Sequence, residues 1–270
     1  MTELTGRYVD VLGYRTYYET VGAGSAVVCI HTAGADGREY RHLLPHLASA
    51  GWQGIALDMP GHGKSYPALE TLRPIDTAEE WVDFILAFSE EVGLERPVYV
   101  GGAMSASLLL RLASDYPSAT RGIVAAGAMT NGVGTISTEF LDVLNHPLVN
   151  LSDFMESTTL GLCGPLRPLV SQNECVWHNA RNLTPEVMEA DLRMYSTHNI
   201  DSTVGRIAVP VLHLRGEFDR LLSDDMAAAV RSGVPDVTMV DLPGVGHFPM
   251  LEDPDLFNRT VEAFLQMIKS

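Results

Sequence analysis

The chain has 270 residues, of which 46% are hydrophobic and 19% charged, a balance typical of one large folded domain rather than of a disordered chain. Acidic residues outnumber basic ones 34 to 18, giving a formal net charge of -16, and a surface of this sign repels nucleic-acid phosphates and anionic lipids. Nucleic acids and membranes are therefore not expected as partners.

The first ten residues and the cysteines carry no sign of export. Residues 1–10 include three charged side chains where a signal peptide has an apolar core, and the apolar runs of the chain are too short to span a bilayer. Cys29, Cys163 and Cys175 are odd in number and lack CxxC spacing, which argues against a disulfide framework and a zinc site. We expect a cytoplasmic protein without metal or cofactor.

The predicted elements alternate between strands and helices. Residues 7–22 predict two antiparallel strands that turn at Gly13. Continuous apolar runs predict strands buried on both faces; they cover 26–30, 54–57, 98–100, 122–128 and 210–214. Helical patterns occupy the intervals 38–50, 77–92, 104–116, 223–231 and 253–268. This alternation predicts a doubly wound α/β sheet with helices on both faces.

The alternation breaks between residues 131 and 203. This stretch is rich in helical and loop patterns, contains several glycines and prolines, and shows no buried strand. We interpret residues 131–203 as a helical cap inserted over one end of the sheet. Residues 1–130 and 204–270 would then form the core domain.

Four loops follow predicted strands and contain small or polar residues. They read HTAG (31–34), GGAMSA (101–106), RGEFD (215–219) and GVGHFPMLEDP (244–254). Ligands of open α/β sheets bind outside the carboxyl ends of the strands, so these loops are the candidates for the functional site.

In this order the loops resemble those of the α/β-hydrolase superfamily, and the resemblance covers nearly the whole chain. The family's nucleophile elbow reads G-x-S-x-G; the alignment puts Ala103 on the serine and Ser105 on the second glycine. RGEFD is similar to the acid loop and points to Asp219, and GVGHFPMLEDP is similar to the histidine loop and points to His247. The resemblance implies a mostly parallel, eight-stranded sheet with a helical cap.

The resemblance also implies a role for each residue. A serine hydroxyl needs an adjacent base, and that base needs an acid that holds its tautomer. His247 would be the base and Asp219 the orienting acid. The backbone N–H groups of Ala33 and Met104 would form the oxyanion hole.

Ala103 cannot attack a carbonyl, so we expect almost no acyl transfer from the chain as it stands. Ser105 lies two residues beyond the elbow tip and is expected to point elsewhere. We favour a serine hydrolase inactivated by a serine-to-alanine change, because a binding protein has no need for a buried acid directed at a histidine. Two alternatives stay open: a non-covalent ligand-binding homologue, and a cofactor-free dioxygenase that uses only the histidine and the acid.

The expected substrate is a small molecule with a hydrophobic part. Such pockets are lined mainly by apolar side chains, and the candidates for substrate contact are Thr32, Trp177, Tyr195 and Phe248. An ester or lactone is the default scissile group, with C–C and amide bonds as further options. The oligomeric state stays open, and a homodimer is one alternative.

Overall fold

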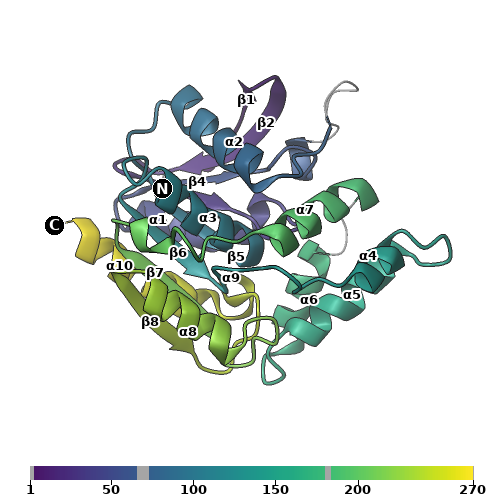
Figure 1. The fold of residues 1–270 in the computed structure, drawn as a ribbon. Coiled ribbons are helices and arrows are strands. Elements are labelled where there is room, and N and C mark those ends of the chain that lie inside the picture. The colour runs from purple at the N-terminus through teal and green to yellow at the C-terminus, as the bar shows by residue number, and fades with distance from the viewer. Residues whose placement is uncertain (1–2, 66–72, 180–183, 270) are drawn as a thin grey trace.

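The computed structural model describes residues 3–65, 73–179 and 184–269. Within these ranges eight strands form one sheet in the order β1-β2-β4-β3-β5-β6-β7-β8 (Figure 1). The strands are β1 (Thr5–Val11), β2 (Tyr14–Val21), β3 (Ala26–Ile30), β4 (Gln53–Leu57), β5 (Val98–Gly102), β6 (Gly122–Ala126), β7 (Val211–Gly216) and β8 (Val237–Leu242). The expected doubly wound sheet is confirmed.

The direction of the strands brings the candidate loops together. β1 and β2 form the expected antiparallel hairpin, whose two turn residues Leu12 and Gly13 have φ values of 52° and 84°, as a type I′ turn requires. β2 also pairs antiparallel with β4, and the other neighbours are parallel. The loops after β3, β5, β7 and β8 therefore leave the sheet at the same edge.

Helices cover both faces of the sheet. They are η1 (Gly37–Tyr40), α1 (Leu43–Ser49), η2 (Gly63–Ser65), α2 (Ala78–Glu91), α3 (Ala103–Asp115), α4 (Thr138–Leu144), α5 (Leu151–Leu162), α6 (Leu169–Asn179), α7 (Pro185–Thr197), η3 (Val204–Arg206), α8 (Asp224–Gly233), α9 (Pro249–Glu252) and α10 (Pro254–Lys269). Phe84 of α2, Leu108 of α3 and Val230 of α8 belong to one buried cluster, and Leu44 of α1 and Phe264 of α10 belong to another. These two clusters form the core on either side of the sheet.

The single helix expected at 38–50 is wrong in one respect. The structure divides it into η1, a 3₁₀ turn, and α1, which begins at Leu43. Pro45 explains the break, because it has no N–H to bond the carbonyl of Arg41 and is tolerated only in the first turn of an α-helix.

Four helices, α4 to α7, lie between β6 and β7, and Figure 1 shows α4, α5 and α6 together to one side of the sheet. The segment leaves and returns at one place, where the N–H of Ile200 donates to the carbonyl of Thr130 at 2.8 Å and Asn131 forms a bridge with Asn199. Throughout the described ranges, every helix falls short of the length or the apolar character needed to cross a membrane.

Candidate active site

The turn from β5 into α3 has the geometry of a nucleophile elbow. Ala103 stands at its tip with φ of 49°, a left-handed conformation that costs a non-glycine residue about 1–2 kcal/mol. The residues before it must be small: a Cβ on Gly101 would lie 2.8 Å from the backbone nitrogen of Ala106, and a Cβ on Gly102 would lie 2.8 Å from Cγ2 of Thr32. The sharp bend presents the Ala103 side chain to a cavity.

His247 and Asp219 form a buried pair across the ends of β7 and β8. Nδ1 of His247 lies 2.9 Å from Oδ1 and 3.0 Å from Oδ2 of Asp219. The same Oδ1 also accepts from the backbone N–H groups of Leu221 at 2.9 Å and Leu222 at 3.2 Å. Since Asp219 engages Nδ1, Nε2 is the nitrogen left for proton transfer, and His247 lines the same cavity as Ala103.

His247 and Asp219 shift each other's pKa. Burial alone would lower the pKa of His247, but the Asp219 carboxylate raises it above its ordinary value. Burial opposes ionisation of Asp219, yet the facing imidazole and the two backbone N–H groups bring its pKa below the usual range. The arrangement is a base whose protonated form is stabilised by a fixed anion.

The peptide between Thr32 and Ala33 is held in a fixed orientation. Its carbonyl accepts from Nδ1 of His31 at 2.8 Å and from the N–H of Ala35 at 3.2 Å. Nε2 of His31 accepts from the N–H of Met59 at 3.1 Å, so the proton of this ring is on Nδ1, and burial lowers the pKa of His31 to about 3. Because the peptide is trans, its N–H, which belongs to Ala33, points opposite to the carbonyl.

Carboxyl oxygens hold the backbone N–H groups on both sides of Ala33. The N–H of Thr32 donates to Oε2 of Glu39 at 2.7 Å, and the N–H of Gly34 donates to Oδ2 of Asp191, from α7, at 2.8 Å. Ala33 itself lines the cavity. The two carboxyl groups therefore fix the backbone of this turn on both sides of Ala33.

Met104 supplies the second candidate donor, because the first N–H groups of a helix have no intrahelical acceptor. Ser105 is turned away from the cavity. Its hydroxyl bonds to the carbonyls of Ile30 at 2.8 Å and Gly102 at 3.0 Å, and its side chain is fully buried. A serine held in this way is in no position to replace the missing nucleophile.

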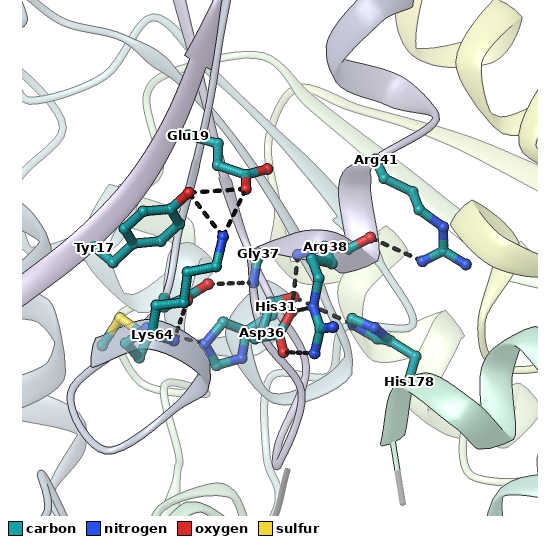
Figure 2. A network of polar contacts seen from close by, with 11 residues as sticks. Tyr17, Glu19, His31, Asp36, Gly37, Arg38, Arg41, Lys64 and His178 are labelled. Carbon is teal, nitrogen blue, oxygen red and sulfur yellow. Dashed lines mark hydrogen bonds and ion pairs between the residues drawn. The ribbon is translucent and has the colours of Figure 1, made fainter. Parts of the chain in front are cut away.

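A polar network around Asp36, in the loop after β3, joins that loop to helix α6 (Figure 2). The Asp36 carboxylate accepts from the guanidinium of Arg38 at 2.6 and 2.9 Å, and its backbone carbonyl lies 3.2 Å from Nε2 of His178. Burial lowers the pKa of His178 to about 4, so this contact is made by a neutral ring. Lys64, nearby, donates to the hydroxyl of Tyr17 at 2.9 Å. The contact of His178 with the Asp36 carbonyl therefore links α6 to the loop after β3.

Glu252 holds the histidine loop in place. Its carboxylate accepts from the N–H groups of Gly246 at 2.8 Å and Phe248 at 2.9 Å, the two neighbours of His247. The same oxygen that binds Gly246 accepts from Gly164 of the cap at 2.7 Å. The Glu252 carboxylate therefore holds both the loop that contains His247 and the segment at Gly164.

The Glu39 carboxyl is expected to make stability fall with rising pH. Burial raises its pKa from 4.5 to about 8. The folded chain thus retains a proton that the unfolded chain loses, and stability declines as the pH rises through this interval. Glu39→Gln should reduce the fall in Tm between pH 5 and pH 9, with the exposed Glu90→Gln as the matched control. Parallel Tm curves for the chain and Glu39→Gln would contradict this.

A cavity of about 300 Å³ opens beside the elbow. Ala103, Met104, Ala33 and His247 form its floor, and its walls are mainly apolar, including Ile136, Phe140, Met155, Leu162, Met188 and Leu192. Among the described residues that line it there is no Lys, Arg, Asp or Glu. The cavity suits a small and partly apolar molecule.

Three of the four expected substrate contacts line this cavity: Thr32, Tyr195 and Phe248. The fourth expectation, Trp177, is wrong. Its side chain is 44% exposed on the outer side of α6, where the guanidinium of Arg38 stacks 4.9 Å from its ring centroid. Cation–π stacking at the surface takes the place of the expected substrate contact.

Several residues of the site carry no local sequence signal. Asn179 lines the cavity from the end of α6. Asparagine is common at helix ends, so its presence there does not indicate a binding site. The carboxylates of Glu39, Asp191 and Glu252 hold distant backbone groups, a function that no pattern along the chain reveals. Only Glu252 lies in a quoted motif, five residues after His247.

The sequence profile of the α/β hydrolase fold family matches residues 25–254. A 2-hydroxy-6-oxononadienedioate/2-hydroxy-6-oxononatrienedioate hydrolase from a Pseudomonas species is 22% identical, with 97% of this chain and 96% of the relative covered. An esterase from Thermogutta terrifontis superposes with a TM-score of 0.84 at 17% identity, covering 98% of this chain and all of the other. An enol-lactonase from Burkholderia xenovorans superposes with a TM-score of 0.85 at 16% identity, covering 96% of this chain and all of the other.

Proposed function

The chain belongs to the α/β hydrolase fold family, and on that premise we propose that its site hydrolyses an ester or lactone of a small, uncharged, partly apolar molecule when serine stands at position 103. Ala103 then makes the present chain a form that binds this substrate without cleaving it. The observation that carries the proposal is the Ala103 elbow tip sharing one cavity with His247, whose Nδ1 is held by Asp219.

Each residue of the site has a role in the proposed reaction. The serine hydroxyl attacks the carbonyl carbon while Nε2 of His247 takes its proton, and Asp219 stabilises the resulting imidazolium. The N–H groups of Ala33 and Met104 bind the oxyanion of the tetrahedral intermediate. Collapse breaks the bond to the alcohol oxygen, to which His247 returns the proton. Water then repeats the attack on the acyl-serine and releases the acid.

The lining of the cavity favours a neutral substrate over a dicarboxylate. The name of the Pseudomonas relative specifies a dioate, which carries two negative charges at neutral pH. Burying a carboxylate without a cationic partner is costly, and the described lining residues of this chain include no Lys or Arg. The esterase and the enol-lactonase share the fold with this chain and act, by their names, on groups of the proposed kind.

The proposal predicts the order of substrate preference of the Ala103→Ser variant. Phenyl butanoate or a small lactone should be hydrolysed with a higher kcat/KM than 2-hydroxy-6-oxonona-2,4-dienedioate, because only the latter must bury carboxylates. Acid release from the ester and loss of dienedioate absorbance measure the two reactions. Faster cleavage of the dienedioate would overturn the ester assignment in favour of C–C hydrolysis.

A further inference from the structure

Two polar side chains beside the apolar cavity have no hydrogen-bond partner among the described residues. Both amide atoms of Asn179 and the hydroxyl of Tyr195 are buried and make no hydrogen bond to any residue in 3–65, 73–179 or 184–269. The two residues are 3% and 4% exposed, and both line the cavity. Buried polar groups of folded proteins are as a rule paired, so a cluster of unpaired ones inside one cavity needs an explanation.

The two side chains come from helices that hydrogen bonds tie to the loop after β3. Asn179 ends α6 and follows His178, whose ring contacts the carbonyl of Asp36. Tyr195 lies in α7, the helix that also supplies Asp191 to the N–H of Gly34. Both helices are therefore held against the loop that lines the cavity next to Ala103.

Both groups are neutral, and each can donate and accept hydrogen bonds. An amide has two donors and an acceptor, and a hydroxyl has one donor and two lone pairs. Burial, together with the Asp219 carboxylate, raises the pKa of Tyr195, so its hydroxyl keeps its proton. This chemistry matches a hydroxyl or carbonyl group and offers no charge to balance a carboxylate or an ammonium.

We propose that Asn179 and Tyr195 form a polar subsite for a hydroxyl or carbonyl group that the substrate carries in addition to its scissile carbonyl. The inference rests on the proposed function and narrows it to uncharged hydroxylated or oxo esters and lactones. Asn179 and Tyr195 determine specificity at this subsite, because an analogue without the extra group leaves their buried atoms unpaired.

Binding to the unmodified chain tests the subsite, since Ala103 leaves esters intact. The probes are phenyl butanoate and its two hydroxylated analogues, phenyl 3-hydroxybutanoate and 4-hydroxyphenyl butanoate, with Kd measured by calorimetry. At least one hydroxylated probe should bind about 3- to 10-fold more tightly than phenyl butanoate, the gain of one net hydrogen bond. Asn179→Leu or Tyr195→Phe should remove this preference and leave the affinity for phenyl butanoate unchanged or improved.

Matched controls come from residues of the same type outside the cavity. Tyr99 is buried and its hydroxyl lies 2.8 Å from that of Ser89, and Asn258 donates to the carbonyl of His42 at 3.0 Å. Tyr99→Phe and Asn258→Leu should keep the preference for the hydroxylated probe. Tyr99→Phe should also lower Tm by about 2–4 °C because it loses a hydrogen bond, whereas Tyr195→Phe should not lower it.

The result that overturns the subsite differs from the one that overturns the proposed function. Equal affinity for plain and hydroxylated probes, a preference that survives both Asn179→Leu and Tyr195→Phe, or a Tm loss in Tyr195→Phe equal to that in Tyr99→Phe would each end the inference. Failure of the Ala103→Ser variant to hydrolyse any probe that the chain binds would instead refute the ester-hydrolase function and leave the subsite standing.

Discussion

Ala103→Ser is expected to raise the turnover of a neutral aryl ester by about 10⁶-fold, the loss that removal of the serine causes in enzymes of this mechanism. The large size follows from what the structure already holds in place: the elbow, the base and acid pair, and the oxyanion turn. In the proposed mechanism, the substitution adds the nucleophilic oxygen. The measurement is the kcat of the purified variant against that of the present chain, with phenyl butanoate as substrate.

Two controls separate a restored mechanism from adventitious hydrolysis. The exposed Ala228→Ser adds the same atom away from the cavity and should leave activity at the level of the present chain. His247→Ala in the Ala103→Ser background should return turnover to that level, because nucleophile and base act as one unit. An Ala103→Ser variant no more active than Ala228→Ser would favour a protein that binds its ligand without covalent chemistry.

Asp219→Asn in the Ala103→Ser background is expected to lower kcat by about 10³- to 10⁴-fold. Without the carboxylate, Nδ1 of His247 loses the partner that holds the reactive tautomer and stabilises the imidazolium. The geometry changes little, so KM should move much less than kcat. The exposed Asp225→Asn serves as the control and should leave both constants unchanged.

The pH profile provides an independent reading of the same pair. The base acts in its neutral form, so kcat/KM of Ala103→Ser should fall as the pH is lowered through the pKa of His247, which lies above its ordinary value of 6.5. Removing the Asp219 charge leaves the effect of burial, which lowers this pKa. The acid limb of Asp219→Asn should therefore shift to lower pH. A limb that stays in place would show that another group controls it.

The turn at residues 31–34 is held by side chains from two other elements and by one of its own. Glu39 of η1 binds the N–H of Thr32, Asp191 of α7 binds the N–H of Gly34, and His31 binds the carbonyl of Thr32. Preorganised donors of this kind act without reorganisation when charge develops. The cap helix α7 thus contributes to the shape of the site as well as covering it.

The sequence by itself determined the sheet and the positions of Ala103, Asp219 and His247. Each of these residues lies within a short motif in the loop after a strand or at the start of the following helix, and a parallel sheet brings such loops to one edge. Alternating apolar runs and helical patterns gave enough information to order the strands and helices. One local prediction was wrong: the expected helix at 38–50 is divided into η1 and α1 because of Pro45.

Tertiary structure alone decided which cap side chains enter the cavity. Trp177 and Asn179 stand two residues apart on α6, and two steps of about 100° place them on opposite sides of a helix. The sequence favoured Trp177 for its size, whereas the packing of α6 against the oxyanion loop turns Asn179 inward and Trp177 to solvent. The rotation of a helix about its axis depends on contacts distant in sequence, as do the partners of Glu39, Asp191 and Glu252, and no pattern along the chain encodes them.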